Sequence, residues 1–144
     1  MKTAHPYLYF NGNTEEAFQF YQSVFDAELM DLLRFGEIEG NPMNASDKDR
    51  DKIAHIALPL GNAILMGTDV IDSMDQSLTF GNNFYITLEP ESAEEAEMVF
   101  HRLSEEGTVQ VPLKKEFWAE KYGMCTDKFG IQWMISYEGS AGSR

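Results

Sequence analysis

The residues in this sequence best suited to proton transfer or nucleophilic attack are three histidines and one cysteine. His5 and His55 each begin a stretch that alternates like a strand, so each can face a binding site or complete the hydrogen bonding of a sheet. For both we favour the structural role. His101 lies beside Phe100, away from the apolar stripe of an amphipathic helix, and we expect it to be solvated.

A catalytic role for Cys125 would require a neighbouring base or cation that lowers the pKa of its thiol. No such neighbour can be placed from the sequence, so we predict a small, buried, apolar side chain. Because Cys125 is the only cysteine, the chain forms no internal disulfide and requires neither an oxidising nor a reducing compartment.

Aromatic and methionine side chains recur on the predicted strands, at Tyr7, Tyr9, Phe84, Trp118, Tyr122, Trp133 and Met134. Strand alternation assigns some of them to the face that packs on helices and the others to an inner face, where an apolar cleft for a small molecule can form. Lys114, Lys115 and Lys121 flank this region. They either attract an anionic ligand or, as we favour, are solvated lysines that protect an edge strand.

The elements that position these residues begin with an aromatic strand and an amphipathic helix. The first half is predicted to contain a strand at 5–10, a helix capped by Asn13 or Thr14, a strand at 29–35, an exposed polar loop at 36–52, and a hairpin with strands at 53–60 and 63–66. The apolar face of the helix comprises Ala17, Phe20, Tyr21, Val24 and Phe25.

The plan then repeats after a linker at 69–83. The second half is predicted to contain a strand at 84–88, a helix at 93–106, a strand at 109–113, and a hairpin with strands at 117–126 and 131–137. A shift of 79 residues places Glu15-Glu16-Ala17 on Glu94-Glu95-Ala96, and a shift of 69 aligns Gly61 with Gly130. This self-similarity predicts a duplicated βαβββ unit.

Length and charge restrict the class of protein. The 144 residues fit a single domain at 1–138, with modules at about 3–69 and 83–138 and a disordered tail at 139–144. The net charge of -13 argues against binding to nucleic acid or to a membrane surface. The sequence shows neither a signal peptide nor a membrane-spanning segment, so we expect a cytoplasmic protein.

Three stretches, at 7–29, 55–69 and 117–135, resemble the PhnB-like branch of the vicinal-oxygen-chelate superfamily, which includes glyoxalases, bleomycin resistance proteins and dioxygenases. The last stretch is the most specific, through Trp118, Tyr122-Gly123, Asp127, Phe129-Gly130 and Trp133. The resemblance implies an α+β fold of two tandem βαβββ modules that form an incomplete barrel, usually in a homodimer. Some members are labelled demethylubiquinone methyltransferases, but no glycine-rich nucleotide-binding loop follows a strand here.

Metal-dependent relatives such as glyoxalase I and the fosfomycin resistance enzymes carry ligands at four positions related by the duplication. His5 matches the first position, whereas the repeat shifts place Phe84, Leu65 and Met134 at the other three. These three side chains offer no oxygen or nitrogen donor, so the resemblance implies a degenerate metal site in which His5 is the only retained candidate. An alignment error of one or two positions would instead bring in Asn83, Asp127 or Glu138.

We therefore predict a homodimeric protein without metal or cofactor that binds an unknown small molecule in an apolar, aromatic pocket. The resemblance implies a pocket between the inner faces of the sheets, lined by His5, Tyr7, Phe84, Trp118, Tyr122 and Met134. One alternative is a metal-dependent lyase, isomerase or transferase of the glyoxalase or antibiotic-resistance type. A second is a dimeric interaction module without chemistry. The sequence leaves open whether the protein is an enzyme.

Overall fold

The computed structural model of the chain describes residues 1–142 and divides them into two compact units, Met1–Thr79 and a second unit that begins at Phe80. Each unit combines one α-helix with a four-stranded mixed sheet. Among the described residues, no helix is both long enough and apolar enough to cross a membrane.

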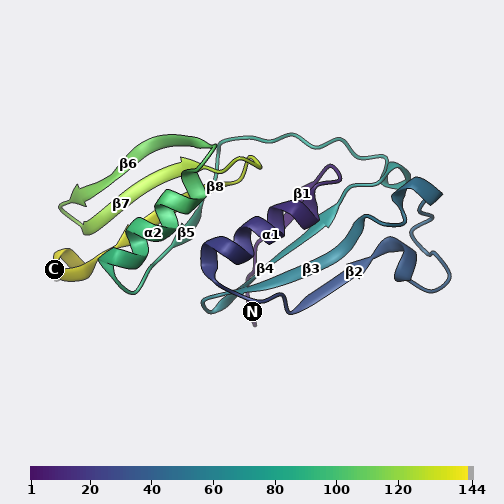
Figure 1. Ribbon diagram of the computed structural model, residues 1–144, viewed down its shortest axis with the longest axis horizontal. Coiled ribbons are helices and arrows are strands. Elements are labelled where there is room, and N and C mark those ends of the chain that lie inside the picture. The colour runs from purple at the N-terminus through teal and green to yellow at the C-terminus, as the bar shows by residue number, and fades with distance from the viewer. Residues whose placement is uncertain (143–144) are drawn as a thin grey trace. The chain divides into compact units, whose positions relative to one another are not determined.

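Unit 1 is built on a sheet with the strand order β1-β4-β3-β2. β1 runs parallel to β4, whereas β4 with β3 and β3 with β2 are antiparallel. Figure 1 shows α1 lying across one face of this sheet. The elements are β1 (Tyr7–Phe10), α1 (Thr14–Phe25), β2 (Asp31–Arg34), β3 (Ile53–Leu60) and β4 (Ala63–Asp69).

Unit 2 repeats this arrangement, with the strand order β5-β8-β7-β6 and α2 packed on one face of the sheet. β5 is parallel to β8, and the other two pairings are antiparallel, as in unit 1. The predicted duplication and the α+β class are therefore confirmed. The elements are β5 (Ile86–Leu88), α2 (Ala93–Ser104), β6 (Thr108–Glu116), β7 (Ala119–Thr126) and β8 (Gln132–Tyr137).

An aromatic residue of each helix packs over a glycine in the sheet beneath it. A Cβ atom at Gly67 would lie 2.7 Å from the Phe18 ring, and one at Gly123 would lie 2.9 Å from the Phe100 ring. The sequence pattern assigned Phe20 and Phe25 to the buried face of α1, but both are only partly buried. Phe18 is fully buried instead, because the glycine in β4 leaves room for its ring.

The N-terminus of α1 is capped from the sheet, which differs from the predicted cap. The side chain of Asn13 forms no capping hydrogen bond. Instead, Asp69 Oδ1 accepts hydrogen bonds from the backbone N–H groups of Gly12 and Thr14, each at 3.0 Å, and its Oδ2 accepts from that of Ile53 at 2.8 Å. One buried carboxylate at the end of β4 thus joins the start of α1 to the start of β3.

The segment 36–52 is largely the exposed polar loop that its composition predicts, and only Ala45 and Asp49 within it are buried. It is flanked and interrupted by the 3-10 helices Phe35–Glu37 and Asp47–Asp49. Phe35, Ala45 and Ile71 form a small buried cluster beneath it. The composition did not reveal these short helices or the small cluster, which hydrogen bonds from the polar residues of the segment to the backbone accompany.

Several boundaries also differ from the prediction. β4 extends to Asp69, β6 covers Thr108–Glu116, and α2 ends at Ser104. In the predicted tail at 139–144, Gly139–Gly142 form a 3-10 helix, and residues 143–144 lie outside the described part of the chain. The N–H of Ser140 donates to Glu120 Oε2 at 3.1 Å, which ties this turn to the start of β7.

Candidate functional site

In each unit, alternate strand residues point away from the helix of that unit, and we call this side the helix-free face. In β1 of unit 1, Leu8 and Phe10 are buried toward α1, whereas Tyr7 and Tyr9 are 41% and 42% exposed. The register places Tyr7 beside Met66, Met66 beside Ala57, and Ala57 beside Asp31. The same face continues with Tyr9, Thr68, His55 and Leu33 in the adjacent row.

Tyr7, His55 and Asp31 form a connected polar group on the helix-free face of unit 1. The Tyr7 hydroxyl oxygen lies 3.1 Å from His55 Nδ1, and His55 Nε2 lies 3.7 Å from Asp31 Oδ2. The Tyr7 ring contacts two further rings, those of His55 and Tyr9, with centroid separations of 5.8 and 5.7 Å. Burial, reinforced by the nearby Tyr9, raises the pKa of the Tyr7 phenol above its ordinary value, so this hydroxyl keeps its proton.

His5 lies immediately before β1 and is engaged with the hairpin of unit 1. The backbone N–H of Ile64 donates to His5 Nδ1 at 3.0 Å. This bond holds the imidazole ring against the start of β4, which is the structural role that we favoured from the sequence. Only Nε2 is left for another partner.

The helix-free face of unit 2 carries a thioether and aromatic surface. Met124 and Met134 are direct neighbours across β7 and β8. The Tyr122 hydroxyl lies 3.5 Å from Met124 Sδ, and the Thr87 hydroxyl donates to Met134 Sδ over 3.7 Å. The Trp118 ring packs edge-on against those of Tyr122 and Phe117, with centroid separations of 5.2 and 4.6 Å. This surface is soft, polarisable and partly exposed.

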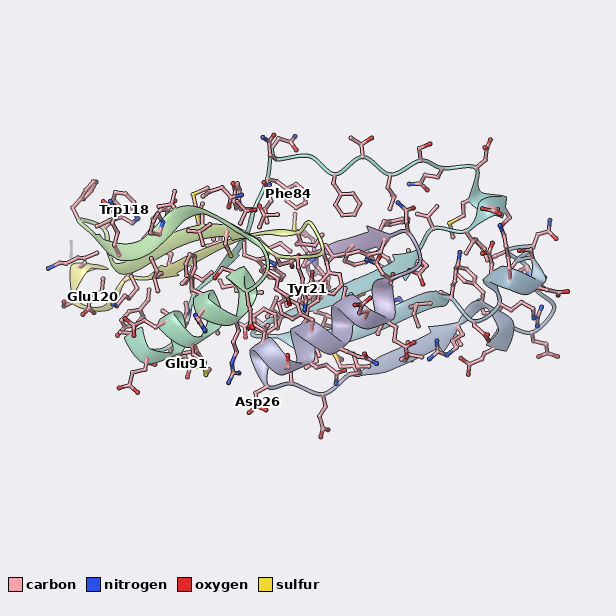
Figure 2. All side chains as sticks on the ribbon, turned by 45° about the horizontal axis from the view of Figure 1, so that its top comes forward. Tyr21, Asp26, Phe84, Glu91, Trp118 and Glu120 are labelled. Atoms are coloured by element: carbon pink, nitrogen blue, oxygen red, sulfur yellow. The ribbon has the colours of Figure 1, made fainter. Side chains whose placement is uncertain are left out.

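The predicted pocket residues of unit 2 do not all gather in one place. Trp118 and Tyr122 lie together near the end of the β6–β7 hairpin, and Met134 follows along β8. Phe84 lies before β5, where its carbonyl accepts from Gln132 Nε2 at 2.6 Å, at the opposite end of the sheet from Trp118. Figure 2 shows these two side chains well apart, with Trp118 near Glu120. Phe84 is 63% exposed.

Cys125 takes the structural role that we favoured and Lys114 lies on the edge strand β6, whereas Lys121 lies on the interior strand β7 and is not the solvated edge lysine that we expected. Cys125 is fully buried on the α2 side of β7, and burial, with a contribution from Asp127, raises the pKa of its thiol to about 12. Lys121 Nζ lies 2.6 Å from Glu97 Oε1, so Lys121 points toward α2 rather than toward the helix-free face. Lys114 pairs loosely with Glu116, at 3.7 Å on the exposed strand β6.

His55 was considered from the sequence, but we favoured a structural role for it and did not include it among the pocket residues. Alternation correctly placed it on the face of Ala57 and Pro59. Its partners Tyr7 and Asp31 come from β1 and β2, which lie on either side of the β3–β4 hairpin. The hydrophobic periodicity of a strand does not predict which strands are its neighbours in the sheet. The one available signal was that three strands of the same module each carry a polar side chain that can bind a proton.

The repeated strand order with one helix on each sheet defines the class of the protein, since the same architecture is found in glyoxalase-like proteins. The FosX fosfomycin resistance protein of Listeria monocytogenes, solved with Mn(II) and 1S,2S-dihydroxypropylphosphonic acid, aligns over 94% of this chain and 92% of its own with a TM-score of 0.64. Their sequence identity is 11%, so the likeness concerns the fold alone. The chain has a glyoxalase-like fold.

The family follows from closer relatives. A family model described as 3-demethylubiquinone-9 3-methyltransferase matches residues 2–136, and the chain belongs to this family, which includes the PhnB proteins. Protein YjdN of Escherichia coli is 31% identical over 91% of this chain and 92% of its own. PA1353 of Pseudomonas aeruginosa is 37% identical with a TM-score of 0.84, covering 96% of this chain and 98% of its own. A putative 3-demethylubiquinone-9 3-methyltransferase, the PhnB protein of Bacillus cereus, is 26% identical with a TM-score of 0.75, covering 94% and 99%.

The repeat shifts used to locate metal positions need correction in both modules. Leu65 is fully buried toward α1, whereas Met134 points away from α2. The β7–β8 connection is longer than the Gly61–Asn62 turn, so the strands differ in phase, and Met66 is the β4 residue on the helix-free face. Four residues separate β5 from α2 but three separate β1 from α1, which moves the counterpart of His5 from Phe84 to Asn83.

The corrected positions do not fit a glyoxalase-type divalent metal. They hold an imidazole, an exposed amide and two thioethers, with no carboxylate to balance the charge of the ion. Asp127, considered as a substitute ligand, already accepts from the N–H groups of Phe129 and Ile131 and from Trp133 Nε1. Among residues 1–142, no three His, Cys, Asp or Glu side chains gather in a way that could hold a metal ion.

Proposed function

We propose that the protein binds a small, largely apolar or aromatic molecule through the helix-free faces of its sheets, without a glyoxalase-type metal. The observation that supports this most directly is the surface of Trp118, Tyr122, Met124 and Met134 in unit 2. This partly exposed face carries polarisable side chains that adapt to ligands of different shape.

Apolar contact is sufficient for useful affinity on such a face. Each 100 Å² of apolar surface removed from water contributes roughly 2–3 kcal/mol before the cost of ordering the ligand is subtracted. The indole of Trp118 is the largest contributor available in unit 2, because Trp133 is fully buried beneath α2. We therefore assign Trp118 as the main apolar contact of the ligand.

The test begins with an unbiased screen of small molecules by native mass spectrometry, followed by titration of the best ligand. Trp118→Ala is expected to weaken its binding about tenfold or more, with little change in melting temperature, because the ring lies at a hairpin end and not in the core. Met98→Ala is the matched control, since Met98 is an exposed apolar side chain on the outer side of α2. Affinity should be the same with and without a chelator.

Two results would contradict the proposal. One is a fall of several degrees in the melting temperature of Trp118→Ala with unchanged affinity, since Trp118 would then be a core residue. The other is binding that disappears in chelator and returns with a divalent ion, which would favour the metal-dependent alternative.

A further inference from the structure

We propose that Tyr7, His55 and Asp31 form a proton relay that removes the proton from a weakly acidic oxygen, a phenol or an enol, of a planar molecule bound on the helix-free face of unit 1. The inference rests on the proposed small-molecule binding and adds a chemical class of ligand and a reaction to it. Its basis is the continuous chain of contacts from the partly exposed Tyr7 hydroxyl through the imidazole to the carboxylate.

The order of the contacts defines the direction of proton flow in the proposed relay. The relay uses the neutral tautomer with its proton on Nε2, the nitrogen that faces Asp31 Oδ2 at 3.7 Å. Nδ1 then carries the free lone pair and accepts from the Tyr7 hydroxyl at 3.1 Å. Tyr7 is thereby aligned to give its own proton to His55 when another proton reaches its oxygen.

The step balances without any co-reactant. The ligand O–H bond breaks, and its proton moves to the Tyr7 oxygen. The original Tyr7 proton moves to His55 Nδ1. The products are a ligand oxyanion, a neutral tyrosine that donates to it, and an imidazolium whose Nε2–H faces Asp31. Tyr7 is protonated before and after the step, because the raised pKa of its phenol disfavours the tyrosinate form.

The surroundings of His55 favour this charge distribution. Asp31 faces it from β2, and Tyr7 and Tyr9 lie toward it on β1. β4 presents Met66 and Thr68 between them, neither of which is ionisable in this range. Among these neighbours, all within the described part of the chain, Asp31 is the one that carries a full charge, with its Oδ2 3.7 Å from His55 Nε2.

The same residues indicate the shape of the ligand. Tyr7 and Tyr9 form a tilted pair of rings, each about two-fifths exposed. Such a pair offers a surface on which a planar molecule can pack while its oxygen meets the Tyr7 hydroxyl. A planar phenol or enol satisfies both contacts.

The experiment uses p-nitrophenol as the probe, because its phenol and phenolate forms differ in visible absorbance, and p-nitroanisole as a probe of similar shape that has no acidic proton. Binding of each is measured by equilibrium dialysis, and the spectrum of bound p-nitrophenol gives the ratio of phenolate to phenol. His55→Gln keeps an acceptor for Tyr7 but takes up no proton. His101→Gln is the matched control, since it makes the same exchange at an exposed histidine of α2, outside the proposed site.

We expect both probes to bind the wild-type protein and the phenolate-to-phenol ratio to fall about tenfold or more in His55→Gln, equivalent to at least one pKa unit. Asp31→Asn should reduce the ratio by a smaller factor, because its carboxylate is farther away and mostly exposed. His101→Gln should leave it unchanged.

Equal ratios in wild type and His55→Gln, with both probes bound, would overturn the relay and leave the binding function intact. Failure of both probes to bind would overturn the ligand class assigned to this face. The binding function would then be judged separately, by the Trp118→Ala titration.

Discussion

At the scale of single residues, Cys125 gives the clearest chemical prediction. Its thiol is fully buried, and its pKa is raised to about 12, first by burial and then by Asp127. The thiol should therefore stay protonated at neutral pH and resist iodoacetamide in the folded protein, reacting readily only in denaturant. Mass spectrometry of labelled samples measures this, and Cys125→Ser serves as the unlabelled control. Equal labelling rates in buffer and in denaturant would refute the assignment.

The roles of some single residues could be predicted from the sequence, whereas those of others could not. The buried, inert role of Cys125 was predictable, because no cation or base accompanied it in the sequence. The capping role of Asp69 was not, since it joins Gly12, Thr14 and Ile53 across distant segments. The rules for helix capping consider a short polar residue directly before the helix. They do not predict a carboxylate that a neighbouring strand places at the helix N-terminus.

At the scale of elements, the segment between β2 and β3 contains a buried carboxylate that is paired with a partly exposed lysine. Asp49 lies at the end of the 3-10 helix Asp47–Asp49, with its side chain 1% exposed. Lys52 Nζ lies 2.8 Å from its Oδ1, and the N–H of Asp72 donates to its Oδ2 at 3.2 Å. The hydrogen bond from Lys52 is the main cause that holds the pKa of Asp49 below its ordinary value of 3.8, and the Asp72 N–H contributes.

This pairing predicts a pH-dependent stability. A carboxyl group with a lowered pKa in the folded state stabilises the fold fully above its unfolded pKa, and this contribution is lost as pH falls through the folded value. Asp49→Asn should therefore reduce the free energy of unfolding by about 1–3 kcal/mol at neutral pH. The gap to wild type should narrow once the pH falls below 3.8.

Urea unfolding at neutral pH and at several acidic values measures the gap. Asp47→Asn is the matched control, because it removes the same charge from an exposed position in the same 3-10 helix. A stability difference between Asp49→Asn and wild type that stays constant across the whole range would contradict the role of the carboxylate.

The elements themselves were predictable in kind and order but not in length. Helix starts and the Gly61–Asn62 turn follow strong local signals, and the structure has them at those residues. β4 and β6 exceed their predicted lengths, since strand ends depend on whether a neighbour supplies hydrogen bonds, as Phe10 does for Val70. The segment 36–52 is mostly exposed as predicted, but its small buried cluster was not predictable, because a few apolar residues within a polar sequence form it.

At the scale of the whole molecule, the duplication was recognisable from the sequence, whereas its register was not. One extra residue before α2 and a longer β7–β8 connection are each small changes. Each changes the alignment of one strand with its counterpart in the other module. Because side chains alternate between the two faces of a sheet, an alignment error of one residue assigns a side chain to the wrong face. That is why Leu65 was assigned to a site although it lies in the core.

The last prediction concerns assembly, and we expect a homodimer in solution. Each sheet has two edge strands, β1 and β2 in unit 1 and β5 and β6 in unit 2. Large apolar side chains remain exposed near them, with Phe117 85% and Phe84 63% exposed. Exposed strand edges and apolar rings are costly in water and promote association, and closed twofold dimers are the commonest way to cover them.

Light scattering coupled to size exclusion measures the mass directly. The expected value is about twice the 16.4 kDa of the chain, and it should fall toward that of the monomer on dilution, because association follows mass action. Phe117→Ser should shift the equilibrium toward the monomer if the β6–β7 hairpin end belongs to the interface, whereas Met98→Ser on the outer side of α2 is the matched control. A wild-type mass of 16.4 kDa at every concentration would refute the dimer.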